Sequence, residues 1–198
     1  MKKILVQVVL FIAIVVLGYF VYESIMEPVK FNQEKKSRDL VVINKLKDIR
    51  NSQMVFKRMN GSYSNNFDSL VDFLKDAELP VVKIIPDPDD TTFTLTINDT
   101  IGFIKVSDTL FKNKSYTLDQ LSLIPFSDGE NFQMDADTIE RGGVEVHVFE
   151  VLAPYTAYLK GMDKQTVINI IAKQEDIEKY PGLKVGSLIE PTTDGNWE

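Results

Sequence analysis

A run of nineteen residues near the N-terminus constrains this chain more than any other feature of its sequence. Residues 4–22 are all hydrophobic except Gln7 and Gly18. As a helix with a rise of about 1.5 Å per residue, the run is about 28 Å long, close to the ~30 Å hydrocarbon core of a bilayer. The run therefore predicts a helix that spans a membrane, with membrane lipid in contact with residues 4–22.

A cleaved secretion signal is the alternative explanation of this run, because Lys2 and Lys3 precede it. The apolar part of such a signal is about 7 to 15 residues long and ends at small residues that the peptidase recognises. Here the run is longer, and the bulky residues Tyr19 and Tyr22 stand at its end. We therefore expect an uncleaved anchor over residues 1–27. Its single span is expected to leave the N-terminus in the cytoplasm and the long C-terminal part outside it.

Charge divides the chain into two parts. Residues 1–59 carry eleven Lys and Arg against five Asp and Glu, whereas residues 60–198 carry eleven against twenty-four. Phosphate binding needs a basic surface, so an acidic domain argues against nucleic acid as a partner. The basic part lies beside the predicted span, where anionic lipid headgroups or the acidic domain of a neighbouring copy would attract it.

A second helical segment is predicted over residues 28–60. Pro28 is expected to break or kink the helix that leaves the bilayer, because proline lacks a backbone donor and clashes with the preceding turn. A new helix is then expected from Ser37 to Asn60, with Gly61 after its end. This amphipathic stalk helix would separate the anchor from a domain formed by residues 61–198.

One face of the predicted stalk helix carries a stripe at intervals of four and three residues: Val42, Leu46, Ile49, Gln53 and Phe56. Two interpretations remain open. The stripe packs on the chain's own sheet, as in most small domains. Alternatively it is a seam for a partner helix, in which Gln53 fixes the register. Under the second interpretation Val42, Leu46, Ile49 and Phe56 bind a partner.

The remaining residues predict an α+β domain with a mainly antiparallel sheet and a C-terminal helix. A short helix is expected over residues 67–75, capped by Asn65 or Asn66, and a last helix over 164–180, capped by Asp163. Strands are predicted over residues 81–85, 92–97, 101–106, 121–125, 131–134 and 144–152. Tight turns are expected at Asp99-Thr100 and at residues 142–143, and the tail after residue 182 is expected to be irregular.

The sequence predicts no catalytic residue, no cofactor site and no metal site. The single histidine, His147, lies in an alternating strand, where a solvated position at the rim is the expected one. The chain contains no Gly-x-Ser-x-Gly and no glycine-rich phosphate loop. Calcium binding by Asp87, Asp89 and Asp90 is the weaker alternative to a solvated turn, because the glycine and distal glutamate of an EF-hand loop are missing.

Aspartate, a hydroxyl residue and an aliphatic residue follow one another in four places, which begin at Asp68, Asp99, Asp108 and Asp137. The pattern resembles the acceptor motif of a periplasmic O-glycosylation system of Gram-negative bacteria, which implies modification of an exported domain. The same tripeptides also suit turns and strand starts. Both interpretations remain open.

The segment from Ile49 to Tyr63, followed by Phe67-Asp68-Ser69-Leu70-Val71, is similar to type II secretion pseudopilins and type IV pilin-like proteins. The family has an apolar helix, an amphipathic stretch ending in a glutamine, an aromatic and a glycine-x-tyrosine, a short helix and a β-rich head. Its cleavage glycine and the glutamate of its mature N-terminus have no counterpart here. The resemblance covers about the first 75 residues and implies an architecture, a membrane-tethered head in the bacterial inner membrane and periplasm.

These features together predict a non-enzymatic, membrane-anchored subunit of a bacterial envelope machine that acts through contacts with other envelope proteins. Trp197, the single tryptophan, is the further partner-binding candidate, and burial in its own domain is the alternative. Two other function classes remain open: an extracytoplasmic ligand-binding or sensor module, and an envelope hydrolase that uses acidic residues.

Overall fold

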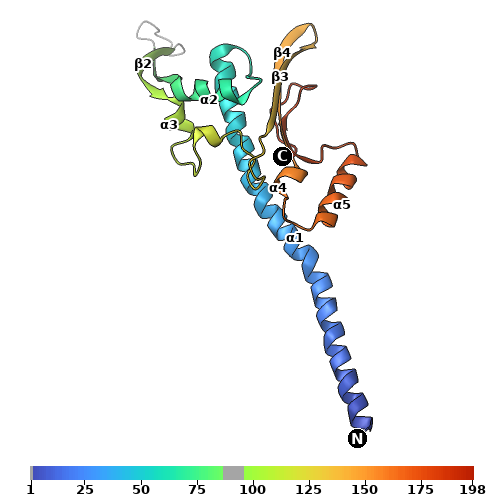
Figure 1. Cartoon of the computed structure of the whole chain (residues 1–198). Coiled ribbons are helices and arrows are strands. Elements are labelled where there is room, and N and C mark those ends of the chain that lie inside the picture. The colour runs from blue at the N-terminus through green and yellow to red at the C-terminus, as the bar shows by residue number, and fades with distance from the viewer. Residues whose placement is uncertain (1, 87–95) are drawn as a thin grey trace.

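The computed structural model of the chain describes residues 2–86 and 96–198, and it has an α+β fold (Figure 1). The elements are, in order, α1 (Lys2–Asn60), α2 (Phe67–Asp76), β1 (Glu78–Pro86), β2 (Thr96–Lys105), α3 (Val106–Leu110), the 3-10 helix η1 (Leu118–Gln120), β3 (Gln133–Arg141), β4 (Val144–Pro154), α4 (Tyr155–Tyr158), α5 (Lys164–Glu175) and β5 (Gly182–Gly186). The predicted fold class is confirmed at this level.

The predicted helix break at Pro28 is wrong. α1 continues from Lys2 to Asn60, with Pro28 inside it. A proline in a helix removes one backbone donor and crowds the carbonyl group four residues earlier, here that of Ser24. The turns that follow are held by packing that begins at Phe31, which is 8% exposed. The expected anchor and stalk are therefore two parts of one helix.

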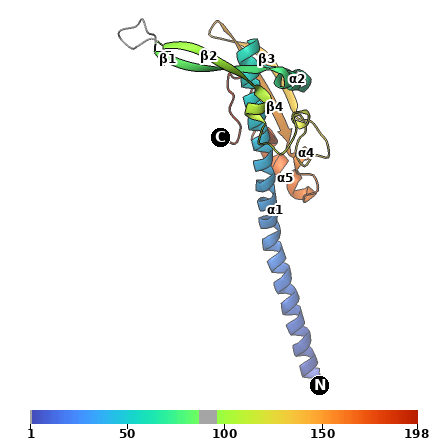
Figure 2. The same ribbon diagram turned by 90° about the vertical axis from the view of Figure 1, so that its left-hand side faces the viewer.

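The two parts of α1 differ in their surroundings. We call residues 2–30 the free segment and residues 31–60 the covered segment. Large hydrophobic side chains that the structure describes between residues 4 and 25 are all at least 45% exposed. The free segment extends away from the rest of the molecule in both views (Figures 1 and 2) and is long and apolar enough to cross a membrane.

The rest of the chain forms a head around the covered segment. β3, β4 and β5 form an antiparallel sheet in the order β3-β4-β5, and β5 lies against α1. α2 and α3 contact α1 as well, so α1 rises between these helices and the sheet (Figure 1). The core lies along α1, and its fully buried side chains include Leu46, Leu70, Leu74, Phe149 and Val151.

The sharpest confirmed turn joins β3 to β4. Arg141 pairs with Val144 across the two-residue loop of Gly142 and Gly143, whose φ angles are +62° and +80°. Positive φ at both positions is the requirement of a type I′ hairpin turn, which glycine meets without steric cost. The predicted caps are also present, because the side chains of Asn66 and Asp163 accept bonds from the first turns of α2 and α5.

The predicted tight turn at Asp99-Thr100 is wrong. β2 passes through both residues, and Thr100 pairs with Val82 of β1. The β1–β2 sheet is a two-stranded antiparallel ladder with a register shift between Val81 and Val82. The predicted strand over residues 92–97 and the connection at residues 87–95 fall largely outside the described residues. Cross-strand pairing over a longer ladder thus prevails over the local turn preference of aspartate and threonine.

Three other sequence predictions are corrected in the C-terminal half. Residues 121–125 form no regular strand, and only an isolated bridge joins Leu123 to Asn131. The last helix ends at Glu175, and Ile177, expected to face inward, is 53% exposed. The tail after residue 182 is not irregular, because β5 begins there and pairs with β4. Pairing between distant segments, which no local pattern reveals, supplies the backbone hydrogen bonds of β5.

Candidate functional site

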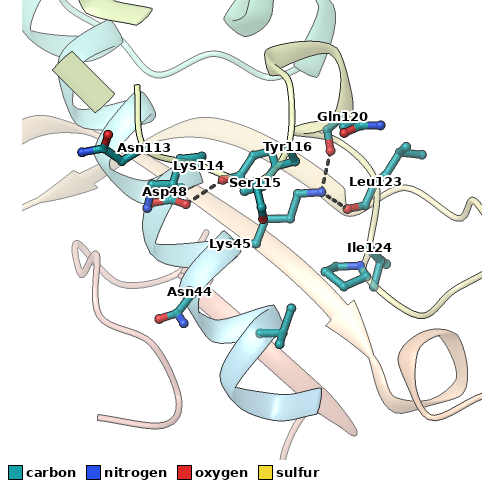
Figure 3. Close-up of a pocket in the computed structure, with 12 residues that line it drawn as sticks. Asn44, Lys45, Asp48, Asn113, Lys114, Ser115, Tyr116, Gln120, Leu123 and Ile124 are labelled. Atoms are coloured by element: carbon teal, nitrogen blue, oxygen red, sulfur yellow. Dashed lines mark hydrogen bonds and ion pairs between the residues drawn. The ribbon is translucent and has the colours of Figure 1, made fainter. Parts of the chain in front are cut away.

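The largest cleft that the structure describes has a volume of about 750 Å³ and lies beside α1 (Figure 3). One wall is the covered segment of α1, with Val41, Asn44, Lys45 and Asp48. The other wall is formed by residues 113–125, which connect α3 to the sheet. The cleft therefore depends on how this connection is fastened to the helix.

Local bonds shape the connection before it reaches α1. Thr117 caps η1, and its backbone and the side chain of Gln120 complete a capping box. Leu121 is fully buried, and the ring of Phe111 meets that of Tyr116 edge-on at 6.2 Å between centroids. Buried apolar side chains on both sides of Tyr116 thus bring its ring and hydroxyl against the helix.

Lys45 fastens one end of the connection to α1. Its side chain is buried, and Nζ donates to the carbonyl oxygens of Gln120 at 2.5 Å and Leu123 at 2.6 Å. The ammonium also lies 4.7 Å from the centroid of the Tyr116 ring, within the range of a cation–π contact. Burial lowers the pKa of Lys45 from its usual 10.5 to about 8, and the charge of Asp48 partly opposes this shift.

Asp48 fastens the other end. Its carboxylate accepts a hydrogen bond from the Tyr116 hydroxyl at 2.6 Å and pairs with Lys114 Nζ at 2.7 Å. Burial and the hydrogen bond to Asp48 raise the pKa of Tyr116 well above its usual value, so the phenol keeps its proton. Lys45, Asp48, Lys114 and Tyr116 therefore hold the two walls together and use their polar atoms in doing so.

The side chains free to contact a molecule in the cleft are different ones. Asn44, Asn113 and Ser115 line it and are exposed, beside the apolar surfaces of Val41 and Pro125. Amide and hydroxyl groups both donate and accept hydrogen bonds, so this lining suits an uncharged polar group next to an apolar one. Lys45 itself escaped the sequence analysis. The signal was its position three residues after Val42 and four before Ile49, at the edge of the apolar stripe.

The stripe predicted on the stalk helix lies in the chain's own core. Val42, Leu46 and Ile49 are fully buried against the head, as the first interpretation expected. As a seam for a partner helix the stripe is wrong for these three residues, because no part of their surface is left for another chain. Phe56 is partly buried and packs edge-on against Phe73 at 4.9 Å between ring centroids, so a partner contact there stays a prediction.

Gln53, proposed as the polar position of a seam, has an internal role. It is fully buried, its Nε2 donates to the carbonyl oxygen of Ser64 at 2.7 Å, and its Oε1 accepts from the Ser64 amide at 2.9 Å. This pair closes the loop that leads from α1 to α2. A buried amide with both ends bonded in this way fixes one backbone arrangement.

Trp197 packs against the core in the part of the tail that runs back along β5. Asn196 exchanges hydrogen bonds with the backbone of Lys184, and Arg50 of α1 pairs with Glu198 at 2.9 Å. The ring lies over Gly195, where a Cβ atom would collide with the indole. The structure thus places Trp197 on its own domain, and a role in partner binding stays a prediction.

His147 lies at the rim of a smaller cleft of about 390 Å³, where Nδ1 is 2.8 Å from the hydroxyl of Thr138. The backbone carbonyl of His147 accepts from Lys57 of α1. The half-buried position of the ring agrees with the expected rim histidine. The calcium candidates Asp87, Asp89 and Asp90 lie outside the described residues.

The four aspartate-hydroxyl-aliphatic tripeptides occupy unlike places: the first turn of α2, the middle of β2, α3 and β3. Their hydroxyl residues Ser69, Thr100, Thr109 and Thr138 are all exposed. O-glycosylation of these residues stays a prediction, which the intact mass of the native protein tests. A mass equal to that of the sequence would contradict it.

Comparisons with protein-family models, with curated proteins and with solved structures find no match for this chain.

Proposed function

We propose that this chain is a non-catalytic, single-pass membrane protein of the bacterial cell envelope. In this proposal it is an inner-membrane subunit of a machine for secretion, surface assembly or motility. Its head stands in the periplasm and acts through contacts with other envelope proteins. The observation that carries the proposal is the uninterrupted helix α1, which is exposed and apolar in its free segment and forms the core of the head in its covered segment.

The free segment supports the membrane part of the proposal. An exposed apolar surface of this length is costly in water, and lipid is the solvent that removes the cost. A helix also satisfies its own backbone hydrogen bonds, which a segment inside a bilayer requires. Tyr19 and Tyr22, at 60% exposure each, stand at the end where the apolar run meets the charged residues, as interfacial aromatic residues do.

The β1–β2 hairpin supports the protein-contact part. Val82, Ile84, Ile101 and Phe103 on its two strands are 46% to 66% exposed. The hairpin projects sideways from the rest of the head (Figure 2). An isolated two-stranded hairpin is marginally stable in water, and exposed apolar patches are typical of interaction surfaces.

The resemblance to pseudopilins and pilin-like proteins supports the same role. A long helix that is free in its first half and packed on an antiparallel sheet in its second half agrees with the tethered head that the resemblance implies. The missing cleavage glycine and intramembrane acid argue that this chain stays an individual tethered subunit.

Membrane extraction tests the anchor. We expect the native protein to remain with the membranes in alkaline carbonate and to enter solution only with detergent. Because the chain contains no cysteine, single cysteines report orientation cleanly. In intact cells with a permeable outer membrane, an impermeant thiol reagent should label Ser115→Cys, whereas Lys3→Cys should react only after lysis. A native product that begins beyond Tyr22, or the reverse labelling, would contradict the proposal.

Crosslinking in native membranes, followed by mass spectrometry, tests the partners. We expect crosslinks to components of a secretion, assembly or motility machine, and we expect Ile84→Asp with Phe103→Asp to reduce them. Val144→Asp is the matched control, because Val144 is 62% exposed on the β3–β4 hairpin. Recovery of the chain without crosslinked neighbours would count against the proposal.

The cleft beside α1 favours a second candidate function, an extracytoplasmic ligand-binding or sensor module. Its volume of about 750 Å³ lies within the range of small-molecule sites, and its lining combines apolar and polar groups. Native mass spectrometry of the purified protein would then reveal a bound small molecule that Asn44→Trp removes and Asn51→Trp, at an exposed position outside the cleft, retains. Absence of any bound mass would count against this function.

A further inference from the structure

The outer side of the covered segment carries a second, exposed stripe. Val29, Lys36, Leu40, Lys47, Met54 and Arg58 follow one another at intervals of seven, four, seven, seven and four residues. This spacing places them on one face of a helix, over a length of about 44 Å. Val29, Leu40 and Met54 are 41%, 54% and 51% exposed. We call this stripe the basic ridge, because its charged residues are all basic.

Other basic residues of the covered segment have acidic partners. Lys35 pairs with Asp39 at 2.6 Å, and Arg38 pairs with Glu34 at 2.8 Å. Arg50 pairs with Glu198 of the tail. In contrast, the charged residues of the ridge form no ion pair with any acidic residue in ranges 2–86 and 96–198. The head carries an excess of acid, yet the chain leaves this face without it.

The β3–β4 hairpin carries the complementary charge. Asp135, Asp137, Glu140 and Glu145 are all exposed, and we call them the acidic strip. Glu140 stands directly opposite Glu145 in the ladder. Like charges in directly opposed positions destabilise a strand pair, so a basic surface laid against the strip would relieve their repulsion.

The ridge and the strip lie at the same level of the molecule. Met134, beside Asp135, contacts Gln53 of α1, and the carbonyl of His147 binds Lys57. The strip is thus level with the upper turns of α1, where Met54 and Arg58 of the ridge lie. Because α1 is one continuous helix, a copy anchored in the same membrane would hold its strip at the height of a neighbour's ridge.

We propose that the basic ridge of one copy binds the acidic strip of a second copy of this chain in the same membrane. The inference rests on the proposed membrane anchor. The contact joins two different surfaces, so it is heterologous, and each copy still presents a free ridge or a free strip to the next. Anchoring raises the effective concentration of one surface near the other without any new contact.

The absence of cysteine from the chain allows a direct test in vesicles of neutral phosphatidylcholine. Full-length chains with Met54→Cys and chains with Asp137→Cys are reconstituted together and oxidised. A disulfide-linked mixed dimer is expected from this pair. Met54→Cys mixed with Lys173→Cys, an exposed position on α5, supplies the background of random collision and should give roughly tenfold less dimer.

Charge reversal then identifies the cause. In the Met54→Cys chain, Lys36→Glu, Lys47→Glu and Arg58→Glu together should lower the yield to the background. Reversing the strip of the partner with Asp135→Lys, Glu140→Lys and Glu145→Lys should restore it. The matched control is the triple Lys112→Glu, Lys173→Glu and Lys179→Glu, which changes the net charge equally at exposed positions outside the ridge and should leave the yield unchanged.

The outcomes separate this inference from the proposed function. If both chains float with the vesicles but the mixed pair gives only background dimer, the self-contact is wrong and the anchor stands. The same holds if the control triple lowers the yield as much as the ridge triple, or if strip reversal fails to restore a folded ridge variant. If the chains do not float, both the anchor and the self-contact are wrong.

Discussion

The free and covered segments of α1 share one helix but obey different rules of residue placement. In the free segment apolar side chains point in every direction, and those described between residues 4 and 25 are exposed. In the covered segment apolar side chains keep to one face, and Val42, Leu46 and Ile49 have no exposed surface. A helix that is apolar all round calls for an apolar solvent, whereas an amphipathic helix buries its stripe against protein.

The difference teaches how the chain couples its two environments. Packing fixes the covered segment in the head, and the backbone continues through Pro28 without a loop. A helix transmits orientation along its length, whereas a flexible linker of the same number of residues would not. The proposed anchor therefore sets the height and direction of the head, and the most informative substitutions are those that act on one segment alone.

Charges in the free segment should have the largest effect. Ile12→Lys with Val16→Lys places two lysines near the middle of the proposed span, at a cost of about 6 kcal/mol for insertion. We expect this variant to leave the membrane fraction. Leu40→Lys with Met54→Lys makes the same change at exposed positions of the covered segment and should stay with the membranes. Retention of the first variant at the level of the unchanged protein would refute the anchor.

Truncation of a buried leucine separates the segments by stability. Leu46→Ala should destabilise the head by about 2 to 5 kcal/mol, because it leaves a cavity in a close-packed core. Leu17→Ala removes the same atoms from a side chain that is 63% exposed, and it should leave the unfolding of the head unchanged. Thermal unfolding of the full chain in detergent, followed by circular dichroism, measures both. Equal midpoints for the two variants would contradict the assignment of the core.

Removal of the residues after Asp194 tests whether the tail belongs to the covered segment. The truncation removes the Arg50–Glu198 pair, the bonds of Asn196 to β5 and the packing of Trp197. We expect a loss of about 1 to 3 kcal/mol in the free energy of unfolding. Ile189→Ala, at a side chain 79% exposed in the same tail, is the control. A stable truncated head that no longer captures its partners would instead favour Trp197 as a docking residue.

Local signals in the sequence were sufficient for features that depend on neighbouring residues. The apolar free segment, the cap of α2 at Asn66 and the glycine turn between β3 and β4 all arise from side chains within a few positions of one another. The stripe of Val42, Leu46 and Ile49 was visible too, and only its partner remained undecided.

Features that depend on distant residues could not be read in this way. β5 is a strand because it pairs with β4, and its short sequence between two glycines gives no alternating pattern. The candidate cleft exists because Lys45 reaches carbonyl groups 75 and 78 residues further along the chain. Helix continuity at Pro28 likewise depends on packing that starts at Phe31. Each case is a tertiary contact that prevails over a local preference.

Lys45 offers the finest distinction, because it is a charge within the buried side of α1. In the folded chain its pKa is about 8, against the usual 10.5. Below pH 8 both states hold the proton. Between pH 8 and 10.5 the unfolded chain binds more protons than the folded one, so the free energy of unfolding should rise with pH in this window.

Lys45→Met isolates this contribution. At pH 7 the variant should be less stable, since the carbonyls of Gln120 and Leu123 lose their donor. The advantage of the unchanged protein should then grow by about 1 to 2 kcal/mol between pH 7 and 9.5, which thermal midpoints in detergent would record. Lys112→Met, at an exposed lysine, should show no such growth. A difference that stays flat would mean that the two carbonyls hold the proton on Lys45 in spite of its burial, and that the residue acts as a permanently charged clamp.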